Sequence, residues 1–135
     1  MVLFKKKKRS YCTLRDVLSI PDQAYTVIKL YVGRKAFLKD LIIECDLTLQ
    51  ADSKVLYIMV GNKVYSTVTL TQAGFILYDK WYSEITTTGG FFARSRFVYK
   101  DIDAEINNSE GVLYITLWQN SGSAFTISAT AKFIK

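Results

Sequence analysis

The fold of this chain is decided by ten consecutive residues, Leu41-Ile42-Ile43-Glu44-Cys45-Asp46-Leu47-Thr48-Leu49-Gln50. Every odd-numbered position holds Leu, Ile or Cys, whereas the even-numbered positions after Ile42 hold Glu, Asp, Thr and Gln. Because successive side chains of a β-strand point to opposite faces of a sheet, the pattern predicts a strand with one dry face and one mostly wet face. Cys45 falls on the dry face, where a thiol behaves as a small apolar side chain.

The same two-residue period recurs in two later segments. Over 125–133, Phe, Ile and Ala alternate with Thr, Ser and Lys, which predicts a second half-buried strand. A third strand is predicted over 112–118. Its inward side chains are expected to be Leu113, Ile115 and Leu117, with Tyr114, Thr116 and Trp118 on the opposite face.

Weaker β patterns occupy most of the remaining chain. Strands are expected over 25–32, 54–60, 63–70, 75–85 and 92–106, and each of the last two is long enough to bend or break once. Gly61-Asn62 is a two-residue link of the kind that closes a tight hairpin, so the strands on either side of it are predicted to pair. Residues 11–20 suit either a first strand or a short helix, and Pro21 ends that element in both cases.

These segments amount to eight or nine strands, without a convincing helix of ten or more residues. One-sided alternation at this spacing indicates antiparallel sheets packed face to face. The predicted fold class is therefore all-β, a single antiparallel β-sandwich that is jelly-roll-like, with an immunoglobulin-like sandwich as the main alternative. We expect the sandwich domain over 11–135, a basic N-terminal arm over 1–10, no transmembrane helix and no signal peptide.

The formal net charge of +6 is concentrated in the arm, where five cations follow one another: Lys5, Lys6, Lys7, Lys8 and Arg9. The remaining 13 of the 18 basic residues are balanced by 12 acidic residues, so the body is nearly neutral. The arm is a candidate contact for nucleic acid, or for an anionic membrane that Val2, Leu3 and Phe4 would enter, with a solvated terminus as the alternative. The body shows no basic stripe with interleaved aromatic residues, which argues against a domain that reads RNA or DNA.

No residue pattern identifies a reaction. The chain has no His, which removes Ser-His and Cys-His nucleophile activation, and it has no nucleotide-binding or serine-hydrolase motif. We therefore expect no enzymatic activity and no cofactor.

Asp101, Asp103 and Glu105 stand two residues apart, but strand carboxylates alone supply too few ligands for calcium, so we expect a solvated face and no metal. Cys12 and Cys45 are expected to be buried free thiols, although the sequence leaves a disulfide between them open.

Aromatic residues offer a candidate surface. The residues concerned are Tyr78, Trp81, Tyr82 and Trp118, with Phe91, Phe92 and Tyr99 completing the cluster. Aromatic side chains at this density usually lie in a core or between subunits, so an interface is the first interpretation. A platform for the faces of sugar rings is the alternative.

The outline of the chain, a basic arm over 1–9 before a strand-only body over about 25–134, resembles the small jelly-roll structural proteins of icosahedral viruses. The lack of His, the single Pro and the many Lys, Tyr and Ile residues are similar to residue usage in archaeal viruses of hot environments. The resemblance implies a capsid, penton or minor coat protein of a virion, assembled in the host cytoplasm. Its body would contact copies of itself or other structural proteins, and its arm would face nucleic acid or an internal membrane. A carbohydrate- or receptor-binding β-sandwich, such as a fibre-head or lectin-like module, is the alternative from a different class.

Overall fold

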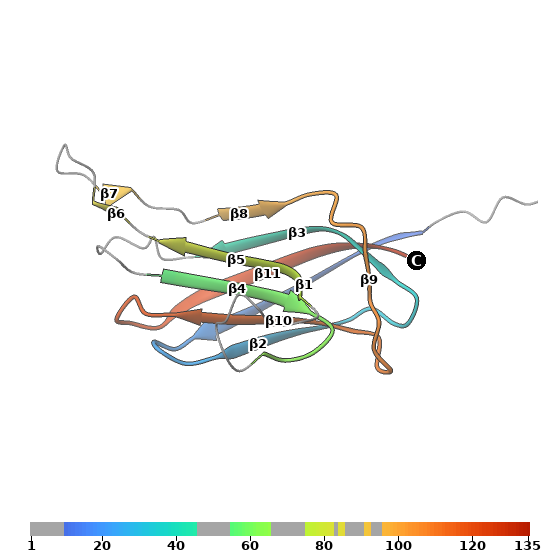
Figure 1. Cartoon of the computed structure of the whole chain (residues 1–135), viewed down its shortest axis with the longest axis horizontal. Coiled ribbons are helices and arrows are strands. Elements are labelled where there is room, and N and C mark those ends of the chain that lie inside the picture. The colour runs from blue at the N-terminus through green and yellow to red at the C-terminus, as the bar shows by residue number, and fades with distance from the viewer. Residues whose placement is uncertain (1–9, 46–54, 66–74, 83, 86–90, 93–95) are drawn as a thin grey trace, which may run out of the picture.

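The computed structural model describes residues 10–45, 55–65, 75–82, 84–85, 91–92 and 96–135, and of 81–82, 84–85 and 91–92 it describes the backbone. These residues form eleven strands and no helix, and hence no helix long and apolar enough to cross a membrane. Nine of the strands build two antiparallel sheets that pack against each other (Figure 1). The predicted all-β sandwich is confirmed.

Sheet A has the strand order β1-β11-β3-β8, and β9 attaches to the start of β3. Its members are β1 (Tyr11–Ile20), β3 (Phe37–Cys45), β8 (Arg96–Tyr99), β9 (Ala104–Glu105) and β11 (Phe125–Ile134). The segment that the sequence left open between strand and helix is thus β1, paired with β11 along its whole length. The alternating segments 41–50 and 125–133 are confirmed as strands in β3 and β11, although 46–50 lies outside the described residues.

Sheet B has the strand order β2-β10-β4-β5. Its members are β2 (Thr26–Tyr31), β4 (Val55–Gly61), β5 (Phe75–Tyr82) and β10 (Val112–Gln119), and the short strands β6 (Glu84–Ile85) and β7 (Phe91–Phe92) pair with each other elsewhere. In β10 the expected inward residues Leu113, Ile115 and Leu117 are fully buried. Tyr114 and Trp118, on the opposite side, are half-buried.

The strand order is that of a jelly roll. Without the two-residue strands β6, β7 and β9, eight strands remain, and they pair first with last, second with seventh, third with sixth and fourth with fifth. A long hairpin wrapped around a core gives this order and divides into two sheets of four strands. The immunoglobulin-like alternative does not fit, because its first strand does not pair with its last.

The core lies between the sheets and takes side chains from every long strand. Its fully buried members include Ile28 of β2, Leu41 and Ile43 of β3, Ile58 of β4, and Ile127 and Ala129 of β11. Cys12 and Cys45 pack partly buried against this core. Cys12 lies opposite Phe133 and Cys45 opposite Ile127, which comes six residues before Phe133 in β11, so the two thiols cannot form a disulfide with each other.

The predicted hairpin at Gly61-Asn62 is wrong. Strand β4 ends at Gly61 and pairs with β10 and β5, while Lys63–Tyr65 is not a strand. The side-chain oxygen of Asn62 accepts a hydrogen bond from the backbone N–H of Asn107 at 2.7 Å, which holds the chain beside the turn before β10. Residues 66–70 of the expected partner strand lie outside the described residues.

The expected long strand over 92–106 is broken, because β8 ends at Tyr99 and β9 begins at Ala104. Asp101 and Asp103 have φ angles of 54° and 52°, which a strand does not permit. Between them the N–H of Ile102 donates to the carbonyl of Lys39 at 2.9 Å, so the segment crosses the start of β3. The alternation expected here survives, because Asp101, Asp103 and Glu105 are exposed.

Candidate functional site

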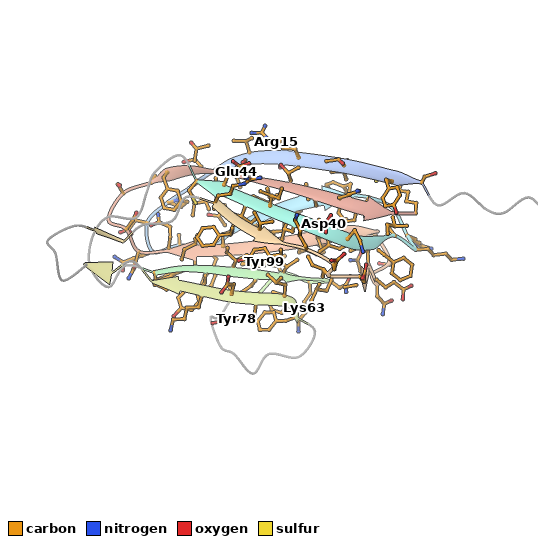
Figure 2. All side chains as sticks on the ribbon, turned by 90° about the horizontal axis from the view of Figure 1, so that it is seen from above. Arg15, Asp40, Glu44, Lys63, Tyr78 and Tyr99 are labelled. Carbon is orange, nitrogen blue, oxygen red and sulfur yellow. The ribbon has the colours of Figure 1, made fainter. Side chains whose placement is uncertain are left out.

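The outer surface of sheet B carries a series of aromatic contacts. We call this surface the aromatic face, and define it by Tyr57, Tyr65, Phe75, Tyr78, Tyr114 and Trp118 together with Lys29, Lys63 and Lys80. The ring centroids are 4.3 Å apart for Tyr65–Phe75, 5.1 Å for Phe75–Tyr78, 6.3 Å for Tyr78–Tyr57 and 5.7 Å for Tyr57–Trp118. The two longest contacts are edge-to-face, an arrangement that aromatic quadrupoles favour. Figure 2 shows Tyr78 and Lys63 on this side of the sandwich and Arg15 and Glu44 on the opposite side.

The register of the sheet brings these residues together. Residues directly opposite each other on antiparallel strands share a face of the sheet. Tyr57 of β4 lies opposite Trp118 of β10 on one side and opposite Lys80 of β5 on the other. Lys29 of β2 lies opposite Tyr114 of β10. Four strands that are far apart in the sequence thus contribute to one surface.

Each lysine of the aromatic face lies over a ring. The Nζ-to-centroid distances are 5.1 Å for Lys80 over Tyr57, 5.5 Å for Lys63 over Tyr65 and 6.0 Å for Lys29 over Tyr114. These distances suit cation–π attraction, and all three lysine side chains are exposed. The fold thus places cations beside aromatic rings on the body, an arrangement that no continuous stretch of the sequence displays.

The centre of the aromatic face is closed. Met59 and Thr116 point outward but are fully buried, and the backbone N–H of Tyr65 donates to Oγ1 of Thr116 at 3.3 Å. The hydroxyl of Tyr65 is also buried and has no hydrogen-bond partner in the described part of the chain. Burial raises the pKa of Tyr65. The accessible rings and lysines therefore surround this closed centre.

The aromatic face has few negative charges. The outward positions described in β2, β4, β5 and β10 include Lys29 and Lys80 but no carboxylate. Glu110 adjoins the face, and its Oε2 accepts a hydrogen bond from the hydroxyl of Tyr114 at 3.0 Å. This hydrogen bond raises the pKa of Tyr114.

The outer face of sheet A is different. Strand β11 presents Thr126, Ser128, Thr130 and Lys132 to this side, and its neighbours add Arg15, Arg96, Asp40 and Glu44. Hydroxyl groups and charges of both signs are mixed there, and the ammonium of Lys132 lies 4.5 Å from the centroid of the Tyr11 ring.

An ion-pair cluster occupies one corner of sheet A. The ammonium of Lys39 lies 2.8 Å from a carboxylate oxygen of Asp101 and 3.1 Å from one of Asp103. Hydrogen bonds to Asp101 and Asp103 raise the pKa of Lys39 well above its usual value, and the bond to Lys39 lowers the pKa of Asp101. Lys39 and Asp103 also line a hollow of about 440 Å³ with Tyr11, Phe37 and Ile134. Within the described ranges, no three His, Cys, Asp or Glu residues gather as metal ligands.

The residues selected from the sequence are only partly brought together. Tyr78 and Trp118 share the aromatic face through Tyr57, which the sequence analysis missed. Alternation marks Tyr57 as an outward residue between buried Leu56 and Ile58, but no local signal identifies its neighbours. The backbone of Trp81 and Tyr82 lies in β5, and their side chains lie outside the description. Val2, Leu3 and Phe4 and the cations Lys5, Lys6, Lys7, Lys8 and Arg9 lie outside the described residues.

Comparisons with known proteins add a structural likeness. No family model and no curated protein matches the chain. Among solved structures, the chain is similar to one reported as "The Structure of Tomato Aspermy Virus by X-Ray Crystallography", with 12% identity and a TM-score of 0.44. The match covers 98% of this chain and 81% of the other. At this identity and TM-score, nothing about function follows from the match.

Proposed function

We propose that this protein is a non-enzymatic structural subunit of a virion, a capsid, penton or minor coat protein. The observation that carries the proposal is the strand order β1-β11-β3-β8 packed on β2-β10-β4-β5. Double-sheet jelly rolls recur in viral capsid domains and in lectin domains. The sandwich would contact copies of itself or other structural proteins.

The edges of the sheets favour contacts through faces and ends. Asp16 of edge strand β1 lies on the inner side, opposite buried Ala129. Asp79 of edge strand β5 lies opposite buried Ile58, and its Oδ2 accepts a hydrogen bond from the Tyr99 hydroxyl at 2.5 Å. Inward-pointing charges on edge strands discourage pairing with the edge of another sheet. Subunits would therefore pack without forming a continuous sheet.

The arm is proposed to reach an inner polyanionic layer, either nucleic acid or an internal membrane. The N–H of Ser10 donates to the carbonyl of Lys135 at 3.3 Å, and the N–H of Lys135 donates to the carbonyl of Ser10 at 2.9 Å. The arm therefore joins the body beside the end of β11. Five successive cations at such a point would give salt-sensitive binding that ignores sequence.

A carbohydrate- or receptor-binding module is the second candidate. It is favoured by the half-buried rings of Tyr57, Tyr78 and Trp118 on one sheet of a lectin-compatible fold. Neutral glycans that bind with a change in tryptophan fluorescence, and lose affinity in Trp118→Phe, would favour this candidate.

The assembly proposal is tested by light scattering and electron microscopy of the full chain over a wide concentration range. Growth of closed particles or oligomers, alone or with co-expressed structural proteins, is the expected result. A protein that stays monomeric under every one of these conditions contradicts the proposal.

Deleting residues 1–9 tests the arm. The melting temperature should stay nearly unchanged, because β1 begins at Tyr11 and, in the part of the chain that the structure describes, the first fully buried side chain is Ile20. Salt-sensitive retention on anionic vesicles should be lost. A truncated protein that is retained as strongly as the full chain would show that the arm is not the membrane contact.

A further inference from the structure

We propose that the aromatic face is a binding surface for single-stranded nucleic acid, separate from the basic arm. Proteins that bind single strands without sequence preference combine cations that follow the backbone with aromatic rings on which bases stack. The aromatic face has both groups, and each lysine lies within 6.0 Å of a ring centroid. The inference does not depend on the proposed virion assembly, and it stands even if no particle forms.

The lysines are placed to contact phosphates on both sides of the rings. Lys29 lies on edge strand β2 and Lys80 on edge strand β5, with β10 and β4 between them. Three strand spacings separate the two edges by roughly 14 Å. Lys80 lies in register with Tyr57 and Trp118, whereas Lys29 lies in register with Tyr114, four residues away along β10. A strand crossing the sheet obliquely would therefore meet Lys29 beside Tyr114 and then Lys80 beside the rings of Tyr57 and Trp118.

The rings at this crossing can be reached. Trp118, Tyr57 and Tyr78 are half-buried, so part of each ring is accessible. Tyr31 stands on β2 two residues from Lys29, with 68% of its surface exposed. Accessible rings beside cations allow bases to stack while the phosphates lie near the ammonium groups.

Charge complementarity favours a polyanion over a neutral sugar. Among the described residues, the face combines Lys29, Lys63 and Lys80 with Glu110 as a neighbouring carboxylate. Recognition of neutral sugar hydroxyls needs acceptors as well as donors, and lysine ammonium groups only donate. The excess of cations therefore matches phosphates.

The charge contribution is tested in the full chain by replacing three lysines at once, Lys29→Gln, Lys63→Gln and Lys80→Gln. A matched control on sheet A removes the same charge with Arg15→Gln, Arg96→Gln and Lys132→Gln. Affinity for a fluorescent oligo(dT) is measured by anisotropy at several salt concentrations. All six side chains are exposed, so both variants should keep the wild-type melting temperature.

The lysine variant should bind oligo(dT) roughly tenfold or more weakly at low salt, and the slope of log K against log salt should fall by about 2. The sheet A control should keep the wild-type slope. Equal effects of the two variants would overturn the proposal, because the contact would then belong to the arm or to net charge. If the lysine variant misfolds, the single change Lys29→Gln is compared with Arg15→Gln.

The stacking contribution is tested with tryptophan fluorescence. Oligo(dT) should quench the emission, and Trp118→Phe should remove most of the quenching. An abasic oligomer with the same number of phosphates should bind more weakly and leave the emission unchanged. Abasic oligomers or heparin fragments that bind as tightly as oligo(dT), or neutral glycans whose binding ignores the three lysines, would each overturn the proposal.

Discussion

The outer faces of the two sheets differ although their inner faces share one core. Sheet A presents hydroxyl groups and charges of both signs, whereas sheet B presents rings and lysines. Each strand supplies both sides, because its side chains alternate. The inward-pointing side chains therefore form the apolar core that jelly rolls share. The outward-pointing side chains determine the chemistry of each outer face.

The two faces should also differ in how much they stabilise the fold. On sheet B, Trp118 packs edge-to-face on Tyr57, and Tyr65 covers fully buried Thr116. On sheet A, outward residues such as Val17 remain 42% exposed. Substitutions on sheet B should thus cost more, and pairs of matched variants can measure the difference.

Trp118→Ala should have the largest effect. It removes the ring contact with Tyr57 and exposes apolar surface, and it should lower the free energy of unfolding by about 2 kcal/mol. Val17→Ala on sheet A should cost less than about 0.5 kcal/mol. Urea denaturation followed by circular dichroism measures both. Similar losses would mean that the faces are energetically alike.

Thr116→Val should have the next largest effect. The substitution keeps the shape of the side chain but leaves the buried N–H of Tyr65 without its acceptor, at a cost of about 1–2 kcal/mol. Thr130→Val, on the half-buried outer side of β11, is the control and should be nearly neutral. A loss of unfolding free energy in Thr130→Val but not in Thr116→Val would contradict the packing of Tyr65 over Thr116.

Tyr65→Phe should be neutral or should stabilise the protein by up to about 1 kcal/mol, because it removes a buried hydroxyl without a partner. The pKa of Tyr65 is raised in the folded state, so the folded protein resists ionisation of this side chain. The wild type therefore keeps its full stability below a pH of about 10 and loses part of it as the pH rises through the folded-state pKa of Tyr65. The variant should therefore tolerate alkali better than the wild type. Tyr11→Phe, at an exposed site on sheet A, should change neither property, and clear destabilisation by Tyr65→Phe would reveal a partner for the hydroxyl.

Asp101→Asn should have the smallest effect, because the Lys39 ion pair is exposed. The pKa of Asp101 is lowered in the folded state, so its contribution is present above a pH of about 4 and is lost as the pH falls through the folded-state pKa. Melting temperatures of the variant and the wild type should differ slightly at neutral pH and converge in acid. Glu44→Gln on the same sheet serves as the control, and a gap that widened in acid would contradict the assignment.

The sequence predicts the strands better than their neighbours. Alternation identifies β3, β10 and β11, because apolar residues at every second position mark the buried face of each of these strands. It does not show that Tyr57 meets both Trp118 and Lys80, because pairing between distant strands has no local signature. The hairpin expected at Gly61-Asn62 fails for the same reason, since a long-range hydrogen bond from Asn107 to Asn62 outweighs the local turn chemistry.

The pairing of β1 with β11 has a consequence for the order of folding. Among the described strands, β1 lies at an edge and pairs only with β11, so the earliest of these strands in the sequence can pair only once the latest has been made. Sheet B and the β3–β8 pair can form earlier, but sheet A closes only when Phe125–Ile134 has left the ribosome. Until then β1 is a ten-residue strand without a partner, attached to the five cations of the arm. Chain closure at this last pairing should be slow, and the repulsion among those cations would help to keep nascent chains apart while they wait.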